Sequence, residues 1–259
     1  MKKIFGFGLF VVLILAIGLF ITLRFFLGGI VKKGVNEYAP RITQTKVELQ
    51  GATLSPFSGV GELNGLSVGN PQGWSAGDAL RLGKVRINME PFTVFKDHIV
   101  INELIVEQPE FLYETKLVAS NIGDLLKNIE QAMSGKAAEA KTKDGKPIKM
   151  VVKKLVLTGG KVTVGAIGTV TAVPLPQIDM VDIGVAEGGV TPAQLAAAVM
   201  RNVTASVVGA ATQALGKGIG GAGGASLDGA KQVGEAIKGI FGGGKKTPEP
   251  KPAAPLPQK

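Results

Sequence analysis

Few side chains in this sequence have the types and spacing that catalysis or metal binding requires. The chain has no cysteine and a single histidine, His98, which excludes a disulfide, an iron–sulfur cluster, a thiolate zinc site and a multi-histidine metal site. We expect His98 to lie at a strand end beside a solvated turn. The closest acidic pair, Asp179 and Asp182 in IDMVDIG, is explained by a surface turn. Acid–base catalysis needs titratable groups positioned in a pocket, so we expect no enzyme activity, no cofactor and no metal.

Two glycine-rich strings look like nucleotide-binding motifs. Residues 216–221, GKGIGG, fit GxGxxG, but they end a helical pattern instead of following a strand, so the mechanism of that fingerprint is absent. Residues 239–245 nearly fit a P-loop, but Lys246 stands where a Ser or Thr would bind magnesium. In a chain with 37 glycines, both matches are compositional accidents.

The net charge of +9 is concentrated at the two ends of the chain. Residues 1–50 carry +5, residues 244–259 carry +3, and everything between carries +1. A nearly neutral body does not attract a polyphosphate, so we expect no nucleic-acid partner. The excess of positive charge suits anionic lipid headgroups better.

Residues 4–23, IFGFGLFVVLILAIGLFITL, form an uncharged apolar run of 20 residues. As a helix this run spans about 30 Å, the thickness of the hydrocarbon core of a bilayer. A cleaved signal peptide is the alternative, but its apolar region is shorter and ends at a small-x-small site, whereas Arg24 is here followed by FFLGGIV. We therefore predict an uncleaved membrane anchor.

Charge alone does not orient this anchor, because lysines and arginine flank it on both sides. The segment after it is expected to continue as a helix along the membrane surface and to end before Pro40. The predicted membrane-surface residues are Arg24, Lys32 and Lys33. A solvated linker helix explains the same segment equally well.

From residue 46 to about residue 176 the apolar pattern is mostly period two, which predicts strands. One phrase recurs: INELIVEQPEFLYE at 101–114 matches VKKLVLTGGKVTVG at 152–165, so that Leu104 aligns with Leu155 and Tyr113 with Val164. A shorter echo, ELNGLSVGNP, stands at 62–71. These echoes indicate a recurring strand–bend–strand unit in an antiparallel sheet.

The parity of the apolar residues switches at Asn102-Glu103 and again at Asn64-Gly65. A change of one residue turns the following side chains to the other face of the sheet, so we expect a turn or bulge at both places. One helix interrupts the strands, with Ser120 or Asn121 able to cap it. Its apolar face would consist of Ile122, Leu125, Leu126, Ile129 and Met133. The polar stretch 134–147 that follows is predicted to be a mobile loop.

The order of these features resembles the amino-terminal module of bacterial AsmA-like envelope proteins. The resemblance covers residues 1 to about 170 and rests on the anchor, on VRINMEP, on IVINELIVEQPEFLYE, on the short helix and on VKKLVLTGGKVTVG. It is a pattern of apolar spacing without catalytic residues. The chain lacks the long series of further strand units found in larger members, which argues against their bridging role.

The resemblance implies an inner-membrane, single-pass protein whose body is periplasmic and whose curved sheet has an apolar inner face. Such sheets are associated with lipid transport and with outer-membrane assembly, which makes membrane lipid and phospholipid acyl chains the expected partners. A closed core explains the same apolar residues equally well. The candidate lipid-binding residues of the groove are Val85, Ile87, Met89, Ile99, Ile101, Leu155 and Leu157.

The last third of the chain is predicted to form helices rich in Ala and Gly. Thr191 as N-cap, Pro192 at the first position and Gln194 form a capping box, and apolar residues then recur every four positions from Leu195 to Ile219. This helix is expected to pack under the sheet, with lipid contact or oligomerisation as alternatives. A shorter helix at 226–241 would precede a disordered, Pro- and Lys-rich tail.

The predicted fold is therefore α+β, with an N-terminal transmembrane helix, a curved antiparallel sheet, a few amphipathic helices and a disordered tail. The predicted divisions are 1–33 for the anchor, 34–185 for the β domain, 186–241 for the helices and 242–259 for the tail. The expected function is lipid handling or envelope assembly. The alternative is a structural adaptor that recruits envelope proteins, or self-associates, through its C-terminal helices without lipid cargo.

Overall fold

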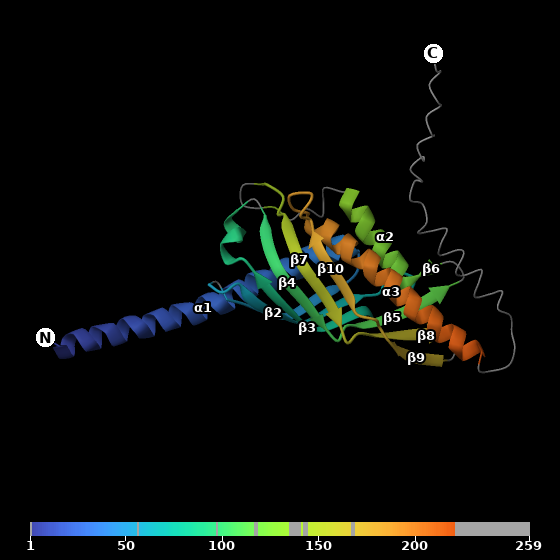
Figure 1. Cartoon of the computed structure of the whole chain (residues 1–259), viewed down its shortest axis with the longest axis horizontal. Helices are drawn as coiled ribbons and strands as arrows, with labels where there is room; N and C mark the ends of the chain where they lie inside the picture. Colours follow the sequence, from blue (N-terminus) through green and yellow to red (C-terminus); the bar gives the residue numbers. More distant parts are fainter. Residues whose placement is uncertain are drawn as a thin grey trace, which may run out of the picture. The chain divides into compact units, whose positions relative to one another are not determined.

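The computed structural model describes residues 2–55, 57–96, 98–116, 119–134, 141, 145–166 and 169–220. The chain divides into two compact units, residues 1–214 and 215–259, and the fold described below is that of the first unit. It is α+β, with one ten-stranded mixed sheet and helices α1, α2 and α3 (Figure 1). The predicted α+β class is confirmed.

The predicted anchor and the segment after it form one helix, α1 (Lys2–Thr43). The helix runs through Pro40, where we expected it to stop, and the buried side chains of Ile42 and Thr43 hold its last turn. Its second half packs against β1 (Val47–Leu54), and the two run antiparallel. One side of this half therefore lies on an edge strand, while Lys32 and Lys33 remain exposed, so a membrane-surface or solvated helix stays a prediction for its other side.

Two contacts fix α1 on β1. Asn36 Nδ2 donates to the Leu49 carbonyl at 3.4 Å, and the Leu49 N–H donates to Asn36 Oδ1 at 2.7 Å, so the side chain satisfies the free backbone edge of β1. Eight residues earlier, Gly28 lies so close to β1 that an added Cβ would be 2.0 Å from the carbonyl oxygen of Ala52.

The order of the strands in the sheet differs from their order along the chain. The order in the sheet is β10-β7-β4-β3-β5-β8-β9, with β2 on the other edge of β3, β1 on β2, and β6 on β5. A short 3-10 helix, η1 (Pro91–Phe95), connects β3 and β4. The remaining strands are β2 (Val60–Gly69), β3 (Asp78–Met89), β4 (Ile99–Glu107), β5 (Glu110–Lys116), β6 (Ala119–Ser120), β7 (Met150–Thr158), β8 (Lys161–Ala166), β9 (Thr169–Pro174) and β10 (Ile178–Ile183).

The sheet is mixed, which corrects the prediction of a purely antiparallel one. β4 pairs with β7 and β5 pairs with β8 in parallel, while the other pairings are antiparallel. The register of the parallel pairs joins Leu104 to Leu155 and Tyr113 to Val164, which is the alignment of the repeated phrase. The two copies run in the same direction because α2 and the segment around it cross back between them, as a parallel connection requires.

The predicted bulge at Asn102-Glu103 is confirmed. Asn88 pairs with Glu103 and Met89 pairs with Ile101, which leaves Asn102 as an extra residue in β4. At Asn64-Gly65 the prediction of a turn or bulge was wrong: β2 runs through both residues with its register unchanged, although Gly65 has a positive φ of 63°.

The helices begin where their caps predicted. For α2 (Asn121–Ser134), the Gly123 N–H donates to Ser120 Oγ at 3.1 Å, so Ser120 is the cap. For α3 (Pro192–Gly220), the Thr191 N–H donates to Gln194 Oε1 at 2.8 Å, and the Gln194 N–H donates to Thr191 Oγ1 at 3.3 Å, which confirms the capping box.

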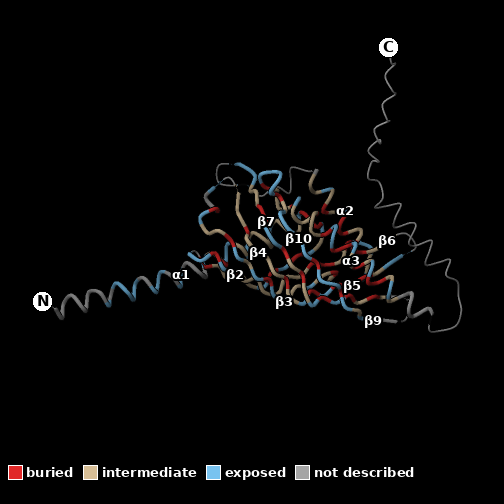
Figure 2. The backbone as a smooth tube through the Cα atoms, in the orientation of Figure 1, coloured by how far each residue is buried: buried red, intermediate tan, exposed pale blue. Residues whose placement is uncertain are grey.

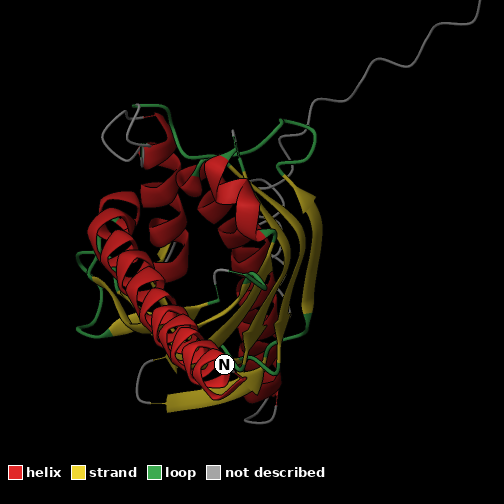
Figure 3. Cartoon of the chain, turned by 90° about the vertical axis from the view of Figure 1, so that its left-hand side faces the viewer, coloured by secondary structure: helices red, strands yellow, loops and turns green. Residues whose placement is uncertain are grey.

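The core lies between the sheet and the helices. The sheet curves around α1, α2 and α3, and the buried residues follow its inner face and the facing sides of the helices (Figures 2 and 3). The predicted face of α2 is confirmed, with Met133 half-buried and Ile122, Leu125, Leu126 and Ile129 buried. The predicted stripe of α3 holds at Val203, Val207 and Ala211, while the side chains of Leu215 and Ile219 lie outside the described residues; at its start Ala193 and Ala197 are buried in place of Leu195 and Val199. A strict four-residue spacing drifts around a helix of 3.6 residues per turn, so one stripe cannot face the core throughout.

Among the side chains that the structure describes, one helical stretch is long and apolar enough to cross a membrane by length and composition, Pro192–Ala214, with 33% of its most apolar window buried. In the predicted anchor at 4–23, the side chains of 4–9, 11, 16, 20 and 23 lie outside the described residues. Most of the predicted loop at 134–147, the predicted helix at 226–241, the string at 239–245 and the tail at 242–259 also lie outside them.

Candidate functional site

The seven residues predicted to line a groove all lie on one face of the sheet, the face toward the helices. One row of paired residues crosses four strands, from Val85 through Val106 and Leu157 to Ile178. A second row joins Met89, Ile101, Val152 and Ile183, and a third joins Ile87, Leu104, Leu155 and Met180. Ile99 pairs with Met150 and lies two residues from Ile101, on the same face.

The bulge at Asn102 is what brings these rows onto one face. Ile101 and Val106 are five residues apart, and in a regular strand they would point to opposite faces. The extra residue restores a common direction, and both side chains are buried. In β7 the exposed pair Lys153 and Lys154 stands at the same level, between buried Val152 and buried Leu155.

Helices cover this face. Val85, Met89, Ile101, Leu155 and Leu157 are 9% exposed or less, and Ile87 and Ile99 are half-buried. We missed Val106, Val152 and Ile178, which are equally buried. The repeated phrase could have identified Val106 and Val152, because Val106 aligns with the predicted residue Leu157 and Val152 aligns with the predicted residue Ile101.

The side of α3 that faces the core consists mainly of small residues. Its buried residues are Ala193, Ala197, Met200, Val203, Thr204, Val207, Ala210 and Ala211. Thr204 Oγ1 is buried without a hydrogen-bond partner among the described residues. Small side chains leave few interlocking contacts between a helix and a sheet. Arg201 Nε donates to Glu130 Oε1 at 2.8 Å, which links the outer side of α3 to α2.

A buried polar network joins α2 to the sheet. Asn121 is 0% exposed; its Oδ1 accepts the Glu114 N–H at 2.9 Å, and its Nδ2 donates to the Leu112 carbonyl at 2.7 Å and to Asn70 Oδ1 at 2.8 Å. Asn70 Nδ2 donates in turn to Glu114 Oε2 at 3.2 Å. The network fixes the start of α2 against β5 and against the loop that begins at Asn70.

The same loop is held by Trp74 on the first turn of α2. Trp74 Nε1 donates to Asp124 Oδ2 at 3.0 Å, and Lys116 Nζ lies 4.6 Å from the centre of the Trp74 ring. Partial burial alone would raise the pKa of Asp124. Hydrogen bonds from Lys127 and Trp74, together with the charges of Lys127 and Lys116, outweigh burial and hold this pKa below its ordinary value.

The lowered pKa predicts how this contact depends on pH. Because the folded-state pKa of Asp124 is depressed, its contribution is present above the ordinary carboxyl pKa and is lost as the pH falls through the folded value. Trp74 is the only tryptophan, so the emission of the protein reports the surroundings of this one side chain. We expect a red shift of that emission below about pH 4, and in Asp124→Ala a red-shifted emission at neutral pH as well.

Glu114 also accepts hydrogen bonds from this loop, from Asn70 Nδ2 and from the Ser75 N–H. Asp179→Asn, at an exposed carboxylate on β10, is the control and should leave the emission unchanged. An Asp124→Ala emission identical to wild type at neutral pH would contradict the assignment of Asp124 as the partner of Trp74.

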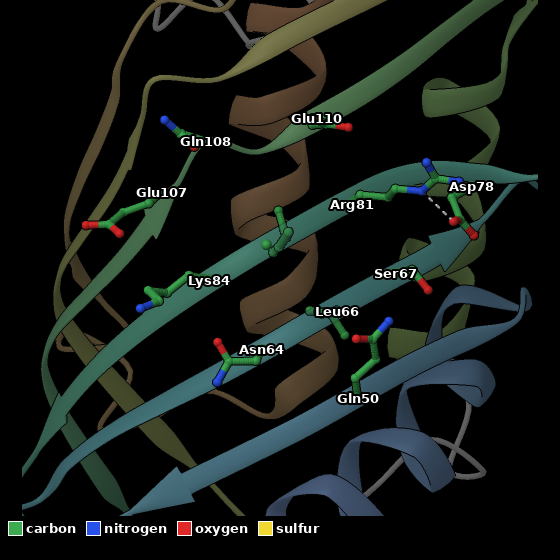
Figure 4. A pocket seen from close by; sticks show the side chains of 13 residues that line it. Gln50, Asn64, Leu66, Ser67, Asp78, Arg81, Lys84, Glu107, Gln108 and Glu110 are labelled. Carbon is green, nitrogen blue, oxygen red and sulfur yellow. Dashed lines mark hydrogen bonds and ion pairs between the residues drawn. The ribbon is translucent and has the colours of Figure 1, made fainter.

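The other face of the sheet is polar and carries a cavity of about 820 Å³ (Figure 4). The cavity lies over a crease, defined here as the line where pairing is interrupted at Gly65, Gly83, Gln108-Pro109 and Gly159-Gly160. Its charged side chains are paired with one another or with neighbours. Arg81 bonds Asp78 at 2.8 Å, and Lys161 bonds Glu110 at 2.6 Å. This arrangement leaves no set of groups converging on a reacting atom.

The acidic pair and the histidine that the sequence analysis considered do not lie together in one site. Asp179 and Asp182 are exposed on β10, where Gln177 Nε2 donates to Asp179 Oδ2 at 2.8 Å. His98 is half-buried immediately before β4, as predicted. Among the described residues, no group of three or more His, Cys, Asp or Glu side chains could hold a metal ion.

The predicted membrane-surface residues lie on α1. Lys32 and Lys33 are exposed, and the side chain of Arg24 lies outside the described residues. Comparison of the chain with protein-family models, with curated proteins and with solved structures found no match.

Proposed function

We propose that this chain is a non-enzymatic, single-pass protein of the inner membrane, related to the AsmA-like proteins, whose periplasmic body handles lipid or supports envelope assembly. The observation that carries the anchor is the exposure of eight large apolar side chains between Phe10 and Ile21, at 48% to 67%. Exposed apolar surface of this extent is rare on a soluble protein. Thr22 Oγ1, at the end of the run, donates to the Gly18 carbonyl at 2.8 Å, so its hydroxyl needs no water.

The apolar rows on the sheet support the proposal that the body handles acyl chains. They form a continuous layer across β3, β4, β7 and β10, and the helix over them, α3, is itself apolar enough for a bilayer. Small side chains on α3 give a weakly interlocked cover, which an acyl chain could replace at modest cost. The polar cavity on the other face suits no lipid chain.

Photoactivatable phospholipids test this function on the full chain in vesicles. With a diazirine in the acyl chain, we expect crosslinked peptides from α1 and also from the sheet rows at Val85, Ile101 and Leu155. Replacing Ala197 with Trp, which fills the space between α3 and the sheet, should reduce crosslinking to the rows and leave crosslinking to α1 unchanged. Crosslinks confined to α1 would contradict lipid handling.

The burial of the seven candidate residues favours one alternative, a structural adaptor with a closed core. In that case the membrane holds the protein through α1, and partners bind elsewhere on the chain. Crosslinks to α1 alone, in a protein that stays folded and membrane-bound, are the result that this alternative predicts.

A further inference from the structure

Exposed large apolar side chains outside α1 gather at one end of the sheet. The residues that the structure describes include five of them, with exposed fractions between 49% and 69%: Phe57, Val60, Phe92, Val181 and Val185. Phe57 and Val60 lie in the turn before β2 and at its start, Phe92 lies in η1, and Val185 lies in the turn after β10. Val181 lies on β10 as that strand approaches the turn.

Contacts show that these segments are neighbours. The Met89 N–H donates to the Gly59 carbonyl at 3.0 Å, and a Cβ on Gly59 would lie 3.1 Å from Pro91 at the start of η1. Further across the sheet, the Ile99 N–H donates to the Lys149 carbonyl at 2.9 Å, and the Met150 N–H donates to the Val190 carbonyl at 2.8 Å. We call this edge, with turn 55–59, η1 and turn 184–188, the proximal end.

Helix α1 brings the proximal end to the level of the predicted membrane span. Because α1 and β1 are antiparallel, moving from Asn36 to Gly28 on α1 corresponds to moving from Leu49 to Ala52 on β1. The predicted span ends five residues before Gly28, a rise of about 7.5 Å. Beyond Ala52, two or three extended residues cover about 7–10 Å in the same direction.

The turn at 55–59 therefore lies level with the edge of the hydrocarbon core. Each headgroup layer of a bilayer is about 5–8 Å thick, so this turn falls within it. Figure 1 shows the short helix η1 on the side from which the first half of α1 emerges, whereas the turn after β10 lies at the top of the view.

We infer that the part of the proximal end formed by the turn before β2 and by η1 inserts into the headgroup layer of the same membrane that α1 crosses, with Val60 and Phe92 as side chains that enter it. The inference rests on the proposed anchor. Apolar and aromatic side chains on a polar body bind at this depth, where their apolar parts leave water. Exposed Lys96 at the end of η1 and Lys32 on α1 supply positive charge for lipid phosphates.

This placement gives the apolar rows a route to lipid. Met89 and Ile101, in the second row, lie next to the turn at 55–59 and to η1, so this row begins nearest the membrane, and the third and first rows follow at increasing distance along the strands. An acyl chain would enter at the proximal end and would not have to cross water.

The absence of cysteine allows a clean test on the full chain. Val12→Cys in the predicted span, Phe92→Cys in η1 and Gln72→Cys are each labelled with a nitroxide in vesicles of phosphatidylcholine and phosphatidylglycerol. Gln72 is exposed in the loop that joins β2 to β3 at the other end of the sheet. Collision rates with oxygen, which prefers lipid, and with a water-soluble nickel complex then report the depth of each label.

We expect the ratio of oxygen to nickel collisions to be highest for the label at position 12 and several-fold lower for the label at position 72. The ratio for the label at position 92 should lie between these two values, clearly above that of position 72. Val60→Cys, at an exposed position at the start of β2, repeats the measurement and should agree with 92. A label at 92 or 60 that behaves like the label at 72, while 12 is in lipid, would overturn the insertion and leave the anchor intact. Water-like behaviour at 12 would overturn the anchor, and the insertion with it.

Discussion

Replacing Gly28 with Ala should cost the protein about 3 kcal/mol or more of its free energy of unfolding. The new Cβ would lie 2.0 Å from the carbonyl oxygen of Ala52 and 2.8 Å from its carbon, and both atoms belong to the backbone, which cannot rotate away. Helix α1 must therefore move off β1, which weakens the bonds between Asn36 and Leu49. Urea unfolding of the full chain in detergent, followed by Trp74 emission, measures the loss.

The adjacent glycine provides a matched control with the opposite expected sign. Gly29 is exposed on the same helix, and an added Cβ would meet nothing within 4 Å. Since Ala favours a helix over Gly by up to about 1 kcal/mol, Gly29→Ala should be neutral or stabilising. Equal effects at the two positions would contradict the close packing of α1 on β1.

The strands, the repeat and the helix caps could be predicted because each has a local cause. Alternation of apolar residues marks a strand, a switch of parity at Asn102 marks a bulge, and Thr191 with Gln194 marks a helix start. Each of these signals is complete within a few residues. The structure accordingly agrees with all three.

The direction of pairing could not be predicted in the same way. Alternating apolar residues look alike in parallel and antiparallel strands, so the pattern of β4 and β7 carries no direction. The repeat contained the missing information, because two copies that lie side by side in register must run in the same direction. The alignment of residues 101–114 with residues 152–165 therefore matches the register in which β4 pairs with β7 and β5 pairs with β8.

The role of Gly28 was also beyond the sequence, for a different reason. In LGGIV, either glycine could be the one that a neighbouring strand approaches, and only the tertiary fold distinguishes them. The same holds for the second half of α1: its lysines suggested a membrane surface, while β1 needed a partner for its free edge. The groove residues were correctly placed on one face, but local patterns do not show that α2 and α3 cover it.

Asn121 has a different role in the fold from the helix cap that the sequence allowed. The sequence allowed either Ser120 or Asn121 as the cap of α2, and Ser120 takes that role. Asn121 then stands one residue inside the helix, where its amide turns to the sheet and bonds the backbone of Leu112 and Glu114. A buried amide with every bond made fixes one arrangement of α2 on β5.

Removal of that amide in Asn121→Ala should cost about 3 kcal/mol of the free energy of unfolding, because it leaves the buried Glu114 N–H and Leu112 carbonyl without partners. Asn121→Asp should cost more, since a carboxylate cannot donate to the Leu112 carbonyl and is itself buried. Asn202→Ala, at an exposed asparagine of α3, is the control and should change stability little. Urea unfolding of the three variants measures these differences.

The order of the three variants tests the physical cause as well as the size of the effect. If Asn121 acted only by filling space, Asn121→Asp, which keeps the shape of the side chain, would be the milder of the two changes at this position. If its hydrogen bonds hold α2 on the sheet, Asn121→Asp is the more severe, and its stability recovers partly when the pH falls and the new carboxyl is protonated, because burial raises the pKa of such a group. Recovery at low pH is expected in Asn121→Asp and not in Asn121→Ala, because a protonated carboxyl is uncharged and can again donate a hydrogen bond, whereas Ala has no titratable group.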